Sequence, residues 1–357
     1  MKFIHTADLH LDSKIEGIPT DKSRVRREEI VRTFEKMVDY ADKNGVRAII
    51  IAGDMFDTSG ITIKTKTRVN EIIKNHPQID FLYLQGNHDE VSFVNENEVP
   101  QNLITFSDEY KSVVYDNVVI TGIVLTSLNQ KVVYDNLVLD AEKTNIVAMH
   151  GQIVGYKSQE KVEVISLPKL KDKNIDYLAL GHIHSYSKEK LDIRGEYAYS
   201  GCLDGRGFDE LGEKGFVLLD CENGKVKSEF IPFSSRILYE FEYDVKSFDT
   251  FYQLTEHIIN DLTSKISSKS LVKVIIKGQH KTDYFVDKFS LAKRLNELFF
   301  FAKVYDKTEL EIKLSDYEFD KSVRGEFVRA VWESEISDEE KNKIITCGLS
   351  ALKGEEI

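Results

Sequence analysis

Residues 3–10 read Phe3-Ile4-His5-Thr6-Ala7-Asp8-Leu9-His10, an apolar run followed directly by an acid and a histidine two positions apart. The short apolar run predicts a buried strand over residues 2–6. Aspartate and histidine are both common metal ligands. The stretch therefore predicts a strand that delivers two ligands to a site at its carboxyl end.

The same arrangement, an apolar run and then a polar cluster, recurs four times downstream. Functional groups in open α/β sheets gather beyond the carboxyl ends of the strands, so we expect all five clusters to converge. The four further clusters are Gly53-Asp54-Met55-Phe56-Asp57, Gly86-Asn87-His88-Asp89, His150-Gly151 and Gly181-His182-Ile183-His184.

The residue types in these clusters indicate a metal centre. Carboxylate, amide oxygen and imidazole together suit Mn²⁺, Fe²⁺ or Zn²⁺, and two metals that share a carboxylate can hold both the attacking and the leaving oxygen of a phosphate. His88 is then left free to act on a substrate. Isolated Asp12 and Asp57 are more typical of helix N-caps. The seven candidate ligands are Asp8, His10, Asp54, Asn87, His150, His182 and His184.

Composition describes a globular chain that works in a reducing compartment. Three cysteines without C-x-x-C spacing favour free thiols and a cytoplasmic location. The amino terminus lacks the pattern of a signal peptide, and no apolar run approaches the roughly 18 residues of a membrane span. The net charge of −12 argues against nucleic acid. However, residues 308–357 carry thirteen acids against seven bases, and bound metal would neutralise several cluster carboxylates.

The order of expected elements predicts a layered α/β domain with mixed sheets. Helices over 24–43 and 62–75 alternate with strands, and a run of strands follows, including 118–124 and 132–139. A hairpin over 216–231, turned at Asn223-Gly224, closes this domain.

Near residue 236 the pattern changes to a small α+β unit, with strands expected at 238–243, 271–277 and 309–314. The tail after it is helical, and Ser337-x-x-Glu340 predicts a capping box. We therefore expect three parts: a domain over 1–235, a small unit over 236–315 and a tail over 316–357.

Together, the motifs D-x-H, G-D-x-x-D, G-N-H-D, H-G and G-H-x-H resemble those of the calcineurin-like metallophosphoesterase superfamily. The finer resemblance is to SbcD-type DNA double-strand break repair nucleases and their YhaO-like relatives. It includes residues 5–12, and also Gly207-Phe208-Asp209-Glu210 with the following 212–216. The resemblance covers 1–235 and implies a four-layer fold of two mixed β-sheets flanked by helices. Residues 236–315 resemble the family's capping domain in the order of elements only.

The resemblance also implies a role for each cluster residue. It places Asp8, His10 and His184 on one metal, Asp54 between the metals, and Asn87, His150 and His182 on the second. Manganese is the implied metal, while the ligands alone leave Fe²⁺ and Zn²⁺ open. His88 would protonate the leaving oxygen, and Asp89 would orient His88.

The implied function is hydrolysis of DNA, as exonuclease and endonuclease, in repair and recombination. Double-stranded ends and single strands are the expected substrates, and an SbcC-like ABC ATPase and a second copy of this chain are the expected partners. Three alternatives stay open: a phosphodiesterase of small molecules or nucleotides, a protein phosphatase, and a DNA-end scaffold without catalysis. The stripe of Val323, Phe327 and Trp332 in the tail could dock on the main body or bind the ATPase.

Overall fold

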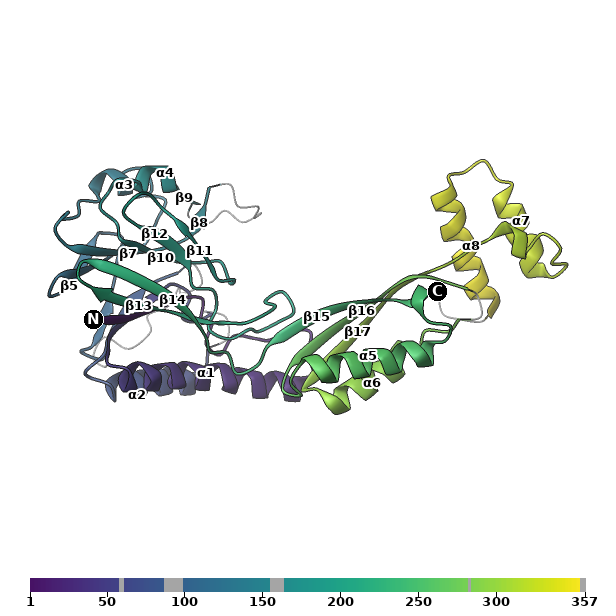
Figure 1. The fold of residues 1–357 in the computed structure, drawn as a ribbon, viewed down its shortest axis with the longest axis horizontal. Coiled ribbons are helices and arrows are strands. Elements are labelled where there is room, and N and C mark those ends of the chain that lie inside the picture. The colour runs from purple at the N-terminus through teal and green to yellow at the C-terminus, as the bar shows by residue number, and fades with distance from the viewer. Residues whose placement is uncertain (58–60, 87–98, 155–163, 282–283, 354–357) are drawn as a thin grey trace. The chain divides into compact units, whose positions relative to one another are not determined.

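The computed structural model describes residues 1–57, 61–86, 99–154, 164–281 and 284–353. The chain forms two compact units, Met1–Leu238 and Tyr239–Ile357, which are treated separately below (Figure 1). The finer division at residues 235 and 315 stays a prediction.

The first unit holds fourteen strands and four helices among its described residues. The helices are α1 (Thr20–Lys43), α2 (Ile63–Lys74), α3 (Val133–Asn136) and α4 (Leu167–Leu170). The strands are β1 (Lys2–Thr6), β2 (Val46–Ala52), β3 (Asp80–Leu84), β4 (Leu103–Thr105), β5 (Lys111–Tyr115), β6 (Val118–Gly122), β7 (Thr144–His150), β8 (Gln152–Ile153), β9 (Val164–Ile165), β10 (Tyr177–Gly181), β11 (Ser187–Lys190), β12 (Glu196–Tyr199), β13 (Gly215–Glu222) and β14 (Lys225–Pro232).

Two six-stranded sheets organise this unit. The first has the order β14-β13-β1-β2-β3-β4 and the second the order β11-β12-β10-β7-β6-β5. Strands β1, β2, β3 and β4 run parallel, and so do β6, β7, β10 and β12, whereas β13, β14, β5 and β11 join antiparallel. Both sheets are therefore mixed. The predicted hairpin is confirmed as β13 and β14, with Asn223 and Gly224 at positive φ in its turn.

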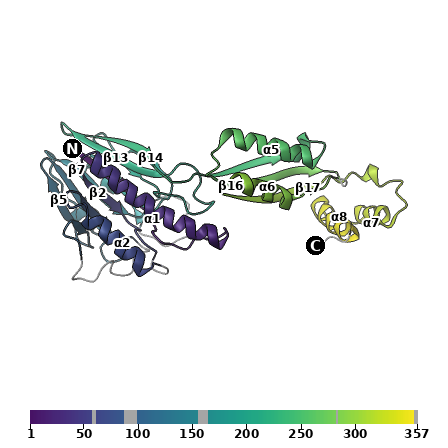
Figure 2. The same ribbon diagram turned by 90° about the horizontal axis from the view of Figure 1, so that it is seen from below.

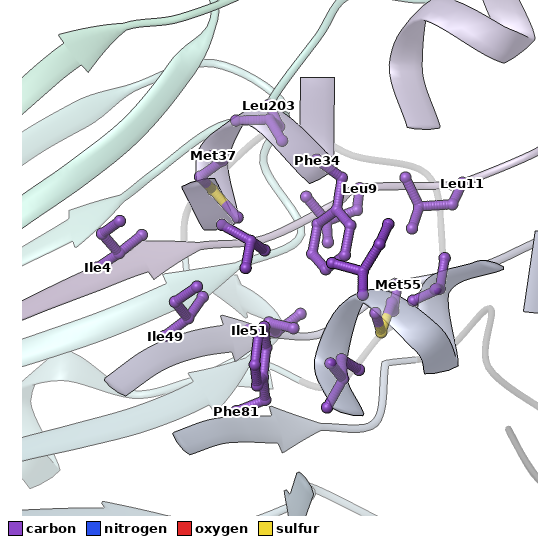
Figure 3. Close-up of a cluster of buried hydrophobic side chains, with 14 of the residues drawn as sticks. Ile4, Leu9, Leu11, Phe34, Met37, Ile49, Ile51, Met55, Phe81 and Leu203 are labelled. Carbon is purple, nitrogen blue, oxygen red and sulfur yellow. The ribbon is translucent and has the colours of Figure 1, made fainter. Parts of the chain in front are cut away.

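Side-chain alternation along the strands builds a four-layer unit. In β2, Ile49 and Ile51 pack toward helix α1 in one apolar cluster, shown with Phe34 and Met37 of α1 in Figure 3. Ala48 and Ile50, one position out of phase, join a second cluster between the two sheets. A third cluster covers the outer face of the second sheet and includes residues of α3 and α4. The predicted layered α/β fold is confirmed.

The second unit is a smaller α/β structure. Its elements are β15 (Leu238–Asp244), η2 (Val245–Ser247), α5 (Phe251–Lys265), β16 (Leu271–His280), α6 (Lys288–Leu298), β17 (Phe301–Leu310), η3 (Leu314–Asp316), α7 (Val323–Trp332) and α8 (Asp338–Lys353). The sheet order is β15-β16-β17, and β16 pairs parallel with β17. Helices α5 and α6 run beside these strands (Figure 2) and share one apolar cluster with Val272, Val274 and Ile276 of β16.

The tail helices form a small core of their own. Val328 of α7 is buried with Ile345 and Leu349 of α8, and Phe327 and Trp332 pack against them. The predicted capping box is confirmed: the Glu340 N–H donates to Ser337 Oγ, and the Ser337 N–H donates to the Glu340 carboxylate.

Two strand predictions are wrong. Residues 132–139 contain the short helix α3 rather than a strand, because Asn129 hydrogen-bonds to nearby backbone groups and Val133 and Tyr134 turn into the core. The last strand is β17, not 309–314. Its polar residues Lys303 and Lys307 lie in register with Lys273 and Lys277 of β16, so a half-exposed strand was mistaken for a loop.

Candidate metal centre

The predicted ligands lie where parallel strands of both sheets end. Asp8 and Asp54 follow the neighbouring strands β1 and β2 of the first sheet. His150 closes β7, and His182 follows its parallel neighbour β10 in the second sheet. The His182 backbone N–H donates to both carboxylate oxygens of Asp8, at 2.9 and 3.0 Å. The carboxyl ends of the two sheets therefore meet at one point.

Unusual backbone conformations turn the chain sharply here. The φ angle is 49° at Asp8, 42° at His10, 48° at Asp54 and 105° at His182. Residues other than glycine adopt this region at a cost, and they do so where the surrounding structure holds them. Here the Asp8 N–H donates to the Gly53 carbonyl at 3.1 Å, and the His10 N–H donates to the Asp54 carbonyl at 2.9 Å.

Close approach of the two sheets also requires glycine beside the ligands. A Cβ atom on Gly53 would lie 1.9 Å from Nδ1 of His150, and one on Gly181 would lie 1.8 Å from the carbonyl oxygen of Ala52. Both distances are far below van der Waals contact. These glycines therefore let the backbone approach the site as closely as the ligand positions need.

The ligand atoms fall into two groups that share Asp8. Those of Asp8, His10 and His184 lie within 4.8 Å of one another, and so do those of Asp8, Asp54 and His150. We call these the His10/His184 group and the His150 group. Nε2 of His10 lies 3.3 Å from Nε2 of His184. Asp54 Oδ2 lies 3.4 Å from Nε2 of His150 and 3.9 Å from Nε2 of His10, between the two groups.

Each of the three imidazoles is held by an oxygen on its outer nitrogen. An Nδ1–H that donates outward leaves the lone pair of Nε2 pointing into the site, the usual arrangement of metal-binding histidines. The partners of Nδ1 are Asp57 Oδ1 for His10 at 3.0 Å, Glu210 Oε1 for His184 at 2.8 Å, and the Ala52 carbonyl oxygen for His150 at 2.9 Å.

This donor set fits divalent cations. Asp8 and Asp54 are each only 1% exposed, and His10 and His150 are also buried. Two carboxylates buried this closely repel each other unless positive charge lies between them. Oxygen and imidazole nitrogen are ligands that manganese, iron and zinc accept. The described residues therefore have the chemistry to hold two such ions.

Burial and neighbouring charges shift the pKa values of several groups here. Burial alone would raise the pKa of Glu210, but its hydrogen bond from His184 and the charge of Arg206 hold that pKa well below its ordinary range. Burial lowers the pKa of His184, and the bond to Glu210 with the charge of Asp8 more than offsets it, so the net shift is upward. Burial and the nearby His150 lower the pKa of His182.

The remaining predicted residues divide into two cases. The His182 ring lies 5.5 Å from that of His150, centroid to centroid, so it borders the site. Asn87, His88 and Asp89 lie outside the described residues.

Three residues that sequence reasoning missed line the site. Asp57, expected to cap a helix, instead holds His10, and Glu210 holds His184. Arg206 contacts both carboxylates. Asp57 is the second acid of the G-D-x-x-D motif, and Glu210 lies in the segment 207–210 that carried the family resemblance. Those patterns were signals for two of the three.

Residues 1–186, more than half of the chain, match the family model "Calcineurin-like phosphoesterase". This chain belongs to the calcineurin-like phosphoesterase family. The predicted calcineurin-like fold is therefore confirmed, and so is a metal-dependent phosphoester hydrolase.

Curated relatives of this phosphoesterase are similar over most of its length. "Uncharacterized metallophosphoesterase YhaO" of Bacillus subtilis is 26% identical over 78% of this chain and 72% of its own. "DNA double-strand break repair protein Mre11" of Aeropyrum pernix is 24% identical over 78% of this chain and 73% of its own. The D-type chain of the nuclease SbcCD of Staphylococcus saprophyticus is 25% identical over 65% of this chain and 69% of its own. The predicted resemblance to SbcD-type and YhaO-like proteins is confirmed.

The family fold binds two divalent metals, which agrees with the two groups of ligand atoms. The assignment of each side chain to a metal, and the roles of His88 and Asp89, stay predictions. Among the described helices, none combines the length and the apolar character needed to cross a bilayer.

Proposed function

We propose that this phosphoesterase is a manganese-dependent DNA nuclease of the SbcD type, acting as exonuclease and endonuclease. The observation that carries the proposal is the pair of ligand groups joined by Asp8, with Asp54 between their histidines. Two metals so held suit phosphodiester cleavage.

The names of two relatives favour DNA as the substrate, one as a double-strand break repair protein and one as a nuclease. The Aeropyrum relative matches 78% of this chain, more than the length of the first unit, so the likeness reaches into the second unit. A small phosphoester would have less use for an added domain of this kind.

In the proposed site the chain holds two manganese ions, and each protein group has one task. When bound, the two cations supply positive charge for the attacking and leaving oxygens of the phosphodiester. Asp57 and Glu210 orient imidazoles, His88 donates a proton to the leaving oxygen, and Asp89 orients His88. The proposed ligands are Asp8, His10 and His184 for one ion, Asn87, His150 and His182 for the other, and Asp54 for both.

The proposed partners are an SbcC-like ABC ATPase and a second copy of this chain, in the cytoplasm. The staphylococcal relative is named as one subunit of the nuclease SbcCD, which supports an assembly with other chains. The tail offers exposed apolar side chains, with Phe319 at 86% and Val323 at 74% exposure. We expect Val323→Asp with Phe319→Ser to abolish co-purification with such an ATPase and to leave hydrolysis unchanged.

The central test offers one enzyme preparation three substrates. Purified protein with manganese is incubated with linear duplex DNA, single-stranded DNA and bis-p-nitrophenyl phosphate. The matched control is His88→Ala, in which we expect manganese binding to persist and cleavage of all three substrates to fall. The control also rules out a contaminating nuclease.

Each alternative has its own outcome in this test. Hydrolysis of the small diester without cleavage of either DNA would replace the proposal by a phosphodiesterase of small molecules. Hydrolysis of phosphopeptides alone would indicate a protein phosphatase. Manganese binding and DNA binding without any hydrolysis would indicate a scaffold.

A further inference from the structure

The guanidinium of Arg206 lies between the two carboxylates that hold the histidines of the His10/His184 group. Its Nε and Nη2 donate to Glu210 Oε1 at 3.0 and 2.7 Å. On the other side, its Nη1 lies 3.5 Å from Asp57 Oδ2. One cation therefore touches the outer partner of His10 and the outer partner of His184.

Two carboxylates turned toward one region need such a cation. Glu210 is 2% exposed, so water does little to screen its charge. Without a positive partner, the two anions would repel and rotate away, and each imidazole would lose the acceptor that fixes its ring. Arginine suits this position because its planar fork can reach two acceptors at once, whereas the lysine ammonium is a single point charge on a flexible stem.

The arginine itself is anchored from two directions. Its backbone N–H donates to Glu210 Oε2 at 2.6 Å, and the Glu210 N–H donates to the Gly207 carbonyl at 2.9 Å, which closes a tight turn. Immediately before it, Asp204 and the Gly205 carbonyl accept from the fully buried Arg26 of helix α1, each at 2.7 Å. The turn is therefore fixed to the helix layer, and its carboxylate is preorganised.

The His150 group is held differently. Nδ1 of His150 donates to the carbonyl of Ala52, at the end of strand β2, and needs no charged partner. Its orientation thus depends on the sheets, while that of His10 and His184 depends on side chains joined by one arginine. The two halves of the centre should respond unequally to a change at Arg206.

We propose that Arg206 is a positioning residue that sets the metal affinity of the His10/His184 group through Asp57 and Glu210, and leaves the His150 group unaffected. The inference rests on the metal centre of the proposed function. Its test is metal binding rather than DNA cleavage, so the two can fail separately.

The experiment compares manganese titrations of the full-length chain, free of DNA, followed by electron paramagnetic resonance of free Mn²⁺. The wild-type chain should show two classes of site. In Arg206→Gln we expect one class to weaken by about 10- to 100-fold, the usual cost of losing an outer partner of a metal ligand. The other class should keep its affinity, and Arg206→Lys should fall between Gln and wild type.

The matched control is Arg194→Gln. Arg194 also forms a two-pronged ion pair, with Asp176 at 3.0 and 2.9 Å, but it lies in the connection between β11 and β12. We expect both manganese classes to be unchanged in this variant. Asp57→Asn, which removes the charge but keeps the shape, should weaken the same class as Arg206→Gln and serves if that variant fails to fold.

Three results would overturn the inference. One is wild-type affinity at both classes in Arg206→Gln and Asp57→Asn. Another is an equal loss at both classes, which would mean a general disturbance of the site. The third is lost hydrolysis with unchanged manganese binding, which would make Arg206 a substrate contact. If the wild-type chain bound no manganese, the proposed function would fail along with the inference.

Discussion

The two units of this phosphoesterase use parallel strands in different ways. In Met1–Leu238, strand ends carry acids and histidines in left-handed backbone conformations. Among the described residues, every non-glycine residue with positive φ lies in this unit, while in Tyr239–Ile357 only Gly278 has positive φ. Strained residues persist only where dense surroundings hold them, so the comparison separates a site-bearing scaffold from a relaxed one.

Burial shows the physical basis of that difference. Six of the seven residues of β2 are buried, because apolar clusters cover both faces of the first sheet. Strand β16 has an apolar face toward α5 and α6, but its other face carries Lys273 and Lys277, paired with Glu240 and Glu242 of β15. Covering on both faces gives the first unit the rigidity that a preorganised site requires.

The largest expected effect is on the site-bearing unit. Asp54→Asn removes the charge between the two ligand groups, and asparagine tolerates the left-handed backbone at this position. We expect hydrolysis of bis-p-nitrophenyl phosphate with manganese to fall roughly 10³-fold, about 4 kcal/mol of transition-state stabilisation. His280→Gln in the second unit is the control and should keep full activity. Comparable rates in both variants would break the comparison.

Stability should respond next. Asp204→Ala leaves Arg26, which has no exposed surface, without its buried carboxylate partner, and this typically costs about 3–5 kcal/mol. In the second unit Glu240→Ala breaks the partly exposed pair with Lys273 and should cost far less. Urea unfolding by circular dichroism measures both changes. The fluorescence of Trp332, the single tryptophan, reports the second unit and should be unchanged in Asp204→Ala. Equal losses in the two variants would contradict the assignment.

A smaller, pH-dependent effect should come from His5. This histidine of β1 bonds the Tyr177 hydroxyl of β10 at 2.9 Å and so links the two sheets. Burial lowers its pKa to about 3, while an unfolded chain has a histidine pKa near 6.5. Between these values the unfolded state binds the extra proton, so stability falls as the pH drops below about 6.5, by at most about 1.4 kcal/mol per pH unit.

His5→Gln should remove that part of the acid sensitivity. The measurement is urea unfolding of both proteins in EDTA from pH 7 down to pH 4.5, which keeps metal binding out of the comparison. Parallel stability curves for the two proteins would show that His5 does not stay neutral in the folded state.

The smallest effect belongs to the second unit. Thr250 caps helix α5: its hydroxyl accepts from the Gln253 N–H, and the Gln253 side chain accepts from the Thr250 N–H. Thr250→Ala should lower the free energy of opening of α5 by about 1 kcal/mol. Hydrogen exchange of peptides from α5 measures it, with peptides from α1 as the internal control. Faster exchange in α1 as well would mean that the two units do not unfold independently.

Local patterns in the chain were enough to predict most of the fold. Apolar runs that end in Asp or His marked β1, β2, β7 and β10, because a buried strand leaves a continuous signal over a few residues. The same reading failed for residues 132–139 and for β17. In both cases the outcome depended on which distant surface the segment meets, and a run of apolar or alternating residues does not encode that.

The sequence by itself determined which residue types stand at the strand ends, and so the kind of chemistry this protein can carry. Tertiary structure alone decided how those side chains are oriented. His10 meets Asp57 across 47 positions, His184 across 174 and Asp54 across 44, and Arg206 reaches Asp57 across 149. Strand-end ligands follow from local hydrophobic patterning. The Asp57–Arg206–Glu210 contacts require two loops packed to within hydrogen-bond distance, which only the folded arrangement of both sheets supplies.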